Sequence, residues 1–194
     1  MSDMLRDNLS RQYHLIAICG GNGAGKSTVA RYLAAKTGWL YLEIEDYYFK
    51  REDDLVSVYK YERARSKEEV ARLLGNDLIK SDNSVIAATR IDFCEEIERQ
   101  LSAVIHLEVP TFERVQRVRE RSHREFGKRM LVGGDLYERE EIFFQRVQER
   151  PLVDLYRWYS HLRCPVYMVD GMMGVESTVD WIIRYVIRIS EYED

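Results

Sequence analysis

The chain has 194 residues, of which 45% are hydrophobic and 32% charged, with a formal net charge of -4. This composition is typical of one folded globular domain and excludes a fibrous or intrinsically disordered protein. Its three cysteines stand far apart without a Cys-x-x-Cys pair, which argues against a disulfide framework and a structural zinc site. No stretch approaches the ~20 apolar residues of a membrane-spanning helix, and the N-terminal residues lack a signal-peptide core. We therefore expect a cytoplasmic protein with no membrane partner.

Short apolar runs of strand length recur along the chain, and helical patterns fill the intervals between them. Capping boxes at residues 66–69, 92–95 and 135–138 predict helix starts, and Pro151 is suited to begin a later helix. Alternating strands and helices are typical of a parallel sheet with helices on both faces. We therefore expect one α/β domain over residues 1–194. Its predicted strands are residues 13–19, 39–44, 84–88, 103–109 and 165–169.

The glycine-rich stretch GGNGAGKST lies between the first predicted strand and a predicted helix. Gly20, four further residues and then Gly25-Lys26-Ser27 match the phosphate-loop pattern in the context that this pattern requires. Lys26 is expected to bridge the β- and γ-phosphates of a nucleotide, and the Ser27 hydroxyl to hold Mg²⁺. Thr28 would approach the α-phosphate or make only a local hydrogen bond. Loop amides would point at phosphate oxygens. The predicted nucleotide-binding residues are Gly21, Asn22, Gly23, Ala24, Gly25, Lys26, Ser27 and Thr28.

Two carboxylates, Glu45 and Asp46, follow the second predicted strand directly. In an open α/β sheet, ligands bind at the carboxyl ends of the strands, so a carboxylate there faces the phosphates. Asp46 would accept a proton from an acceptor hydroxyl or hold Mg²⁺ through water. The alternative for this segment is a solvated acidic loop. Tyr48, two residues further on, would either stack on an acceptor or cover the core.

GGNGAGKST and the Asp-aromatic stretch DYYFK, residues 46–50, resemble the small P-loop kinases, which include nucleoside monophosphate kinases, shikimate kinase and uridine kinase. In uridine-kinase-like enzymes such an aspartate acts near the acceptor hydroxyl. The resemblance implies a three-layer α/β/α P-loop kinase fold with a five-stranded parallel sheet in the order 2-3-1-4-5. It also implies ATP and Mg²⁺ as cofactors, an acceptor-binding insertion at about residues 47–81 and a lid at about residues 117–135. Acceptor ligands within the insertion, taken only as a group, are Tyr59, Lys60, Tyr61, Arg63 and Arg65.

Four arginines recur at helical spacing after Pro110, namely Arg114, Arg117, Arg121 and Arg124. Like charges on one helical face repel unless an anion binds there, an acidic surface pairs with them or solvent screens them. The stretch resembles the entry to the lid of nucleoside monophosphate kinases. By that resemblance, Arg117 stacks on adenine and Arg121 reaches the phosphates. We expect Arg121, with the neighbouring Arg124 as a further candidate, to stabilise the transferring phosphoryl group. An exposed basic helix and an RNA-binding face are the alternatives.

Two further strand ends carry candidate site residues. Arg90 follows the third predicted strand and would bind an acceptor phosphate or carboxylate, whereas Asp92 is interpreted mainly as a helix cap. After the fifth predicted strand, Asp170 either holds Mg²⁺ or forms a turn. The kinase resemblance favours the turn, with the backbone at Gly171 beside the adenine. The sequence does not decide which further arginines contact phosphates among Arg124, Arg129, Arg139 and Arg146.

These features predict an ATP-dependent kinase, a transferase that moves the γ-phosphoryl group of Mg·ATP to a small acceptor. A nucleoside, a nucleotide or a polar metabolite would each fit Asp46, Tyr48 and Arg90. One alternative is a nucleotide-dependent switch, although the Asn/Thr-Lys-x-Asp guanine-reading motif is absent from the sequence. Another is a kinase that acts on polynucleotide ends, which the basic helical face permits. Nucleic acid is otherwise not an expected partner, and the oligomeric state stays open.

Overall fold

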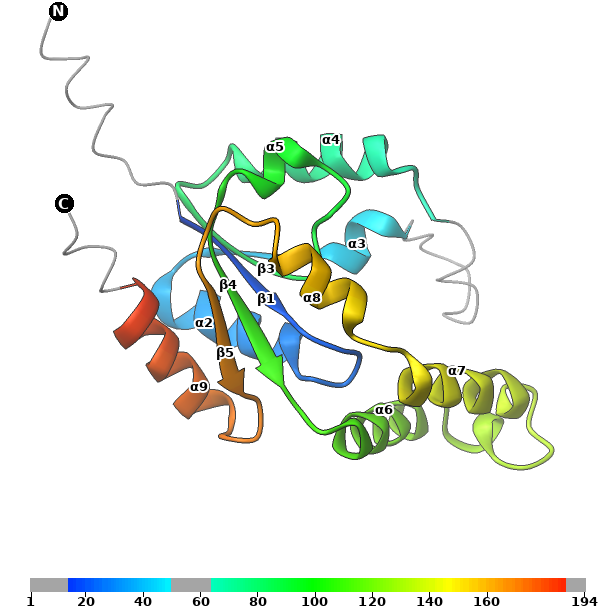
Figure 1. The fold of residues 1–194 in the computed structure, drawn as a ribbon. Coiled ribbons are helices and arrows are strands. Elements are labelled where there is room, and N and C mark those ends of the chain that lie inside the picture. The colour runs from blue at the N-terminus through cyan, green and yellow to red at the C-terminus, as the bar shows by residue number, and fades with distance from the viewer. Residues whose placement is uncertain (1–13, 50–63, 188–194) are drawn as a thin grey trace, which may run out of the picture.

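The computed structural model describes residues 14–49 and 64–187. Its centre is a five-stranded sheet in the order β2-β3-β1-β4-β5, and every neighbouring pair of strands is parallel (Figure 1). The strand order and the parallel pairing confirm the predicted fold. The strands are β1 (His14–Cys19), β2 (Leu40–Glu43), β3 (Asn83–Ala87), β4 (Leu101–Glu108) and β5 (Val166–Asp170).

Helices cover both faces of the sheet, so the chain forms the three layers expected of an α/β/α domain (Figure 1). One face carries α2 (Lys26–Thr37), α9 (Val175–Ile182) and its π-helical continuation η3 (Ile183–Ile187). The other face carries α4 (Lys67–Leu78), α5 (Glu95–Glu98) and α8 (Val153–Tyr159).

Successive residues of the central strand β1 alternate between the two hydrophobic cores. Ile16 and Ile18 pack in the core under α2 and α9, whereas Leu15, Ala17 and Cys19 pack in the core under α4 and α8. A strand that is buried on both faces needs apolar side chains throughout, which explains the uninterrupted apolar run in the sequence. Burial raises the pKa of the Cys19 thiol to about 12, so this cysteine is an unreactive packing residue.

A helical hairpin extends from the carboxyl end of β4 away from the sheet (Figure 1). It consists of α6 (Thr111–Phe126), the 3₁₀ turn η2 (Gly127–Met130) and α7 (Tyr137–Glu149). Two nitrogens of Arg119 bind the Glu141 carboxylate at 2.6 and 2.9 Å, which joins α6 to α7. The segment predicted as a lid therefore lies within a helical hairpin that has its own small core. That core consists of Val118, Met130, Phe144 and Val147.

The predicted start of α4 is confirmed, because the Ser66 hydroxyl accepts the Glu69 backbone N–H at 3.2 Å. The later helix α8 begins at Val153, two residues beyond Pro151. Within residues 14–49 and 64–187, none of the helices combines the length and the apolar character that crossing a bilayer requires.

The other two predicted capping boxes are wrong, since α5 and α7 begin further along the chain than predicted. Asp92 pairs instead with Arg90, whose Nε lies 2.9 Å from Oδ2 of the aspartate. Asp135 accepts two hydrogen bonds from Arg129, at 3.1 and 2.7 Å. In both cases a neighbouring guanidinium offers the carboxylate a partner of opposite charge, which competes with the uncharged backbone N–H of a helix cap.

Candidate active site

The phosphate loop connects β1 directly to α2. Its turn is closed by a hydrogen bond from the Ala24 N–H to the Gly21 carbonyl, at 3.1 Å. Gly25 precedes the first residue of α2, Lys26, and has a φ of 94°, a left-handed conformation that a side chain would strain. The predicted strand, loop and helix are therefore present at the expected residues. Because the loop amides precede the positive end of α2, this region is suited to bind phosphate.

Lys26 is the cation of this loop. Its Nζ donates a hydrogen bond to the Gly21 carbonyl at 3.1 Å. Burial lowers the pKa of Lys26, the nearby charge of Arg121 adds to that effect, and the carboxylates of Glu45 and Glu43 oppose it. Glu45 has the largest influence of the carboxylates acting on Lys26. Carboxylates at and after the end of β2 and an arginine of α6 therefore lie near enough to the loop lysine for their charges to act on it.

Glu43 is linked to Ser27 of the phosphate loop through the hydroxyl of Tyr41. The Tyr41 hydroxyl donates a hydrogen bond to Oε2 of Glu43 at 2.5 Å, and Tyr41 is also hydrogen-bonded to the Ser27 hydroxyl. Burial and the bond to Glu43 raise the pKa of Tyr41, so its hydroxyl stays protonated. Sequence reasoning missed Glu43, although its place at the end of the second strand is the same signal that pointed to Asp46.

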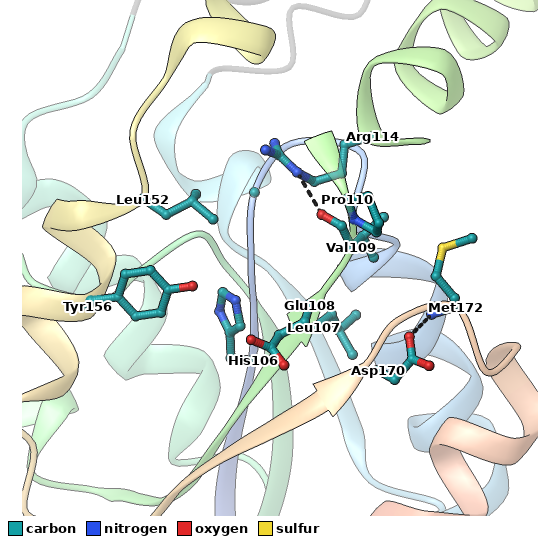
Figure 2. Close-up of a pocket in the computed structure, with 11 residues that line it drawn as sticks. His106, Leu107, Glu108, Val109, Pro110, Arg114, Leu152, Tyr156, Asp170 and Met172 are labelled. Atoms are coloured by element: carbon teal, nitrogen blue, oxygen red, sulfur yellow. Dashed lines mark hydrogen bonds between the residues drawn. The ribbon is translucent and has the colours of Figure 1, made fainter. Parts of the chain in front are cut away.

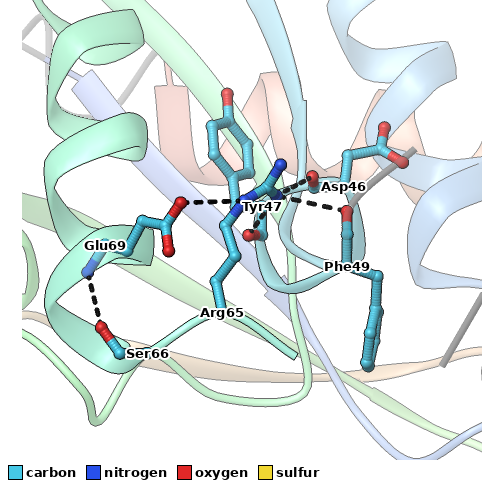
Figure 3. Close-up of polar contacts among 6 residues, drawn as sticks. All are labelled: Asp46, Tyr47, Phe49, Arg65, Ser66 and Glu69. Carbon is cyan, nitrogen blue, oxygen red and sulfur yellow. Dashed lines mark hydrogen bonds and ion pairs between the residues drawn. The ribbon is translucent and has the colours of Figure 1, made fainter. Parts of the chain in front are cut away.

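Asp46 lies in the short helix α3 (Ile44–Tyr48), which follows β2. Figure 3 shows its carboxylate directed away from Arg65, whose Nη1 instead donates to backbone carbonyls at the end of this helix. The distances are 3.3 Å to Asp46, 2.8 Å to Tyr47 and 3.2 Å to Phe49. Arg65 also pairs with Glu69 of α4 at 3.3 Å. The role of Arg65 here is to hold α3 against α4.

Two predicted acceptor residues lie together at the ends of β2 and β3. Burial raises the pKa of Tyr48, and the charges of Asp92 and Arg90 also act on it. The Tyr48 ring meets the Phe93 ring edge-on, with centroids 5.7 Å apart. The Arg90–Asp92 ion pair and the two aromatic rings therefore lie close to one another, after the ends of β2 and β3. Tyr59, Lys60, Tyr61 and Arg63, with the rest of residues 50–63 in the predicted insertion, lie outside the described residues.

Two arginines of α6, Arg117 and Arg121, are linked to the turn after β5 and to the phosphate loop. Nη2 of Arg117 lies 3.2 Å from the sulfur of Met172, the residue after Gly171. Asp170 forms the turn, because its Oδ1 accepts the Met172 backbone N–H at 2.8 Å. Arg121 acts on Lys26, and Arg124 is exposed at the next turn of the same helix.

Arg114 has a position that sequence reasoning did not distinguish from that of the other three arginines. It is only 4% exposed and donates to the Val109 carbonyl at 3.3 Å, to the Asn22 carbonyl at 3.4 Å and to the Thr111 hydroxyl at 3.0 Å. The Asn22 carbonyl belongs to the phosphate loop, so Arg114 ties the first turn of α6 to the outside of that loop. The signal was present in the sequence, because Arg114 is the arginine nearest to the helix start at Pro110.

A family model described as an AAA domain matches residues 16–142, which is more than half of the chain. The chain belongs to the AAA domain family. One curated relative in this comparison is the uncharacterized protein YqaC of Bacillus subtilis (strain 168). It is 24% identical over 180 residues, which cover 88% of this chain and 96% of the relative.

Several solved kinase structures share the fold of this AAA-domain chain. Shikimate kinase from Acinetobacter baumannii, in complex with shikimate, has a TM-score of 0.58 at 19% identity over 93% of this chain and 97% of its own. A gluconokinase from Sinorhizobium meliloti 1021 has a TM-score of 0.53 at 15% identity over 94% and 96%. Deoxyadenosine kinase from M. mycoides has a TM-score of 0.52 at 20% identity over 90% and 99%. These similarities confirm the predicted resemblance to small P-loop kinases at the level of the fold.

Proposed function

We propose that this protein is an Mg·ATP-dependent phosphotransferase that moves the γ-phosphoryl group to a small-molecule acceptor. The observation that carries the proposal is the phosphate loop at the start of α2, where Lys26 is hydrogen-bonded to Gly21 and is acted on by the charges of Glu45, Glu43 and Arg121. Phosphoryl transfer needs cations around the transferring group and a carboxylate for the attacking hydroxyl. The kinase names of the structural neighbours also support a small acceptor. The free cysteines favour a cytoplasmic location.

On the donor side, the loop amides from Gly21 to Thr28 would bind the phosphates. Lys26, Arg121 and Arg124 would stabilise the charge that develops on the transferring group. Arg117 would stack on the base, with the backbone at Gly171 along its edge. The contact between Arg117 and Met172 supports this assignment, because it brings the two sides of the base slot together.

The side chains around the loop fit a magnesium ion. Ser27 would hold it together with a carboxylate, either Asp46 or Glu43, the latter being linked to Ser27 through Tyr41. When bound, the ion would neutralise charge on the transferring phosphate. The described part of the chain contains no group of three or more His, Cys, Asp or Glu side chains suited to a metal. This fits magnesium, which takes most of its ligands from phosphates and water.

On the acceptor side, a nucleoside, a nucleotide or a polar metabolite would lie between Tyr48 and Arg90. The base that receives the hydroxyl proton is a carboxylate of the segment after β2. Asp46 and Glu45 are the two candidates, and the influence of Glu45 on Lys26 is a specific reason to test it beside Asp46.

The test measures ADP formation from Mg·ATP with a panel of nucleosides, nucleotides and hydroxyl-bearing metabolites. We expect one acceptor to raise the rate well above background hydrolysis, and Lys26→Met to remove the stimulated rate. Glu45→Gln and Asp46→Asn then identify the base, since its loss lowers kcat by about 100-fold or more. Glu149→Gln, an exposed carboxylate at the end of α7, is the matched control. Stimulation by a 5′-hydroxyl oligonucleotide alone would identify a polynucleotide kinase, and no stimulation at all would favour a nucleotide-dependent switch.

A further inference from the structure

A cavity of about 460 Å³ lies beside the phosphate loop, between the ends of β4 and β5 and the starts of α6 and α8 (Figure 2). His106 of β4 forms one wall and packs against Tyr156 and Tyr159 of α8. Because α8 and α2 cover opposite faces of the sheet, His106 faces away from the layer of α2, the helix that begins the phosphate site. Gly21 is the one phosphate-loop residue that lines the cavity.

His106 is 1% exposed, and its Nδ1 lies 2.7 Å from the Tyr159 hydroxyl. Burial raises the pKa of Tyr159, so this hydroxyl keeps its proton. Within residues 14–49 and 64–187, Tyr159 has no other hydrogen-bond acceptor, and a buried tyrosine hydroxyl normally donates. We therefore assign the hydroxyl as the donor to Nδ1. The neutral imidazole then carries its own proton on Nε2.

The Nε2–H group of His106 has no partner in the described part of the protein. Nε2 is not completely buried either. Among the residues described, Oδ1 of Asn83 is the one completely buried side-chain nitrogen or oxygen without a hydrogen-bond partner, so Nε2 of His106 keeps some accessible surface. In Figure 2 the His106 ring stands between Tyr156 and Glu108, on the wall of the cavity. The cavity therefore has a buried donor that only water or a ligand can satisfy.

Arg114 adds a cation to the same cavity. Its three hydrogen-bond acceptors are all uncharged oxygens, those of Val109, Asn22 and Thr111. Over the described ranges, no carboxylate lies within ion-pair distance of this guanidinium. A buried charge without a counter-ion is unfavourable, so an anion in the cavity would be bound favourably.

The remaining walls define what else the ligand must be. Leu152 and the ring of Tyr156 provide an apolar side, while the carboxylates of Glu108 and Asp170 are exposed and line the cavity. Two carboxylates repel a ligand with several negative charges, so they disfavour a phosphate dianion and tolerate a single carboxylate. The cavity combines inner donors, an apolar wall and an acidic border.

We propose that this cavity binds a small organic monocarboxylate. Its oxygens accept hydrogen bonds from Nε2 of His106 and from Arg114, and its apolar or ring-shaped body packs against Leu152 and Tyr156. The site adjoins the nucleotide site of the proposed function, because Gly21 and Met172 also line the cavity. Its two ligand-binding groups, His106 and Arg114, are not among the residues assigned to phosphoryl transfer, so the inference does not depend on the proposed function.

The test uses benzoate as the probe and the full chain, followed through the ring ¹H and ¹⁵N signals of its four histidines. We expect millimolar benzoate to shift the His106 signals saturably and to leave those of exposed His161 unchanged. Sodium chloride at equal ionic strength should produce no such shift. Inorganic phosphate should bind about tenfold more weakly than benzoate. Equal or tighter binding of phosphate at His106 would overturn the assignment of a monocarboxylate.

Leu152→Trp fills the cavity while keeping His106 observable, and it should abolish the shift. Val153→Trp, at the exposed neighbouring residue, is the matched control and should retain it. Lys26→Met should retain a saturable benzoate response from shifted starting signals, because the charge of Lys26 acts on His106 although Lys26 does not line the cavity. The inference fails if benzoate causes no shift, if Leu152→Trp still responds, or if Lys26→Met loses the response. The last result would place the probe in the phosphate loop and leave the proposed kinase function intact.

Discussion

Gly21 and Arg114 are in direct contact, and a Cβ atom added to Gly21 would lie 2.5 Å from Nη1 of Arg114. Gly23 is placed as tightly, since its added Cβ would lie 2.3 Å from the backbone carbonyl oxygen of Arg114. The first turn of α6 therefore supports the phosphate loop from outside. Any closing movement of the α6–α7 hairpin has to bend beyond this turn to leave the loop undisturbed.

Gly23→Ala is expected to destabilise the protein and to impair nucleotide binding. The residue has a φ of +83°, which strains a side chain, and the new methyl group would collide with the backbone of α6. We expect a loss of more than about 1 kcal/mol in the free energy of unfolding. Urea unfolding and ADP titration calorimetry measure the two effects.

Gly75→Ala is the matched control for that variant. Gly75 lies within α4, and its added Cβ meets no atom within 4 Å. Alanine in a helix is favoured over glycine, so this variant should be more stable by roughly 0.5–1 kcal/mol and bind ADP normally. Equal behaviour of the two variants would show that the contact with α6 does not shape the loop.

Arg114→Met is expected to weaken ADP binding by about tenfold, because the Asn22 carbonyl loses its partner and the loop loses its support. Arg114→Lys should bind ADP nearly as poorly, since one ammonium group cannot reproduce three hydrogen bonds in fixed directions. Arg99→Met, at an exposed arginine of comparable charge, is the control. Full recovery with lysine would mean that Arg114 acts by charge alone, and calorimetry with ADP makes the distinction.

The sequence was sufficient for the sheet and for the phosphate loop, because both depend on local patterns. Residues 20–28 match a motif that specifies its own strand and helix, and the apolar runs correspond to strands buried on both faces. Which side chains pair with one another depends instead on the folded arrangement, which a local sequence pattern does not specify. Asp92 and Asp135 have the right spacing for helix caps, yet each forms an ion pair with an arginine.

The four arginines of α6 show the same limit within the site. Helical spacing groups Arg114 with Arg117, Arg121 and Arg124 as one exposed basic face. Only the approach of the phosphate loop to the start of α6 buries the first of them. Likewise, the link from Ser27 to Glu43 depends on Tyr41, a residue that no motif distinguishes.

Arg117→Met separates base recognition from phosphate binding. If Arg117 stacks on the base beside Met172, the variant should bind ATP about tenfold more weakly and bind inorganic tripolyphosphate as the wild type does. Calorimetry with the two ligands measures both values on the same preparation. An equal loss for ATP and tripolyphosphate would instead place Arg117 on the phosphates.

His106 makes stability depend on pH in a defined window. Burial, with the charges of Arg114 and Lys26, lowers the pKa of His106 from 6.5 to about 4. Between these values the unfolded chain binds a proton that the folded protein does not. Stability is therefore complete above pH 6.5 and falls as the pH drops toward 4. The shift corresponds to a loss of at most roughly 3 kcal/mol in the free energy of unfolding.

Urea unfolding at several pH values, with wild type and His106→Gln, isolates this contribution. Carboxylates such as Asp77, whose pKa is lowered mainly by its hydrogen bond from Lys80, also lose stabilising interactions toward the acid end of the window. They do so equally in both proteins, so the difference between the two curves reports His106. We expect His106→Gln to be less stable at neutral pH and its curve to be flatter from pH 6.5 downward. His161→Gln, at an exposed histidine, should keep the wild-type slope. Parallel curves for all three proteins would mean that folding does not lower the pKa of His106.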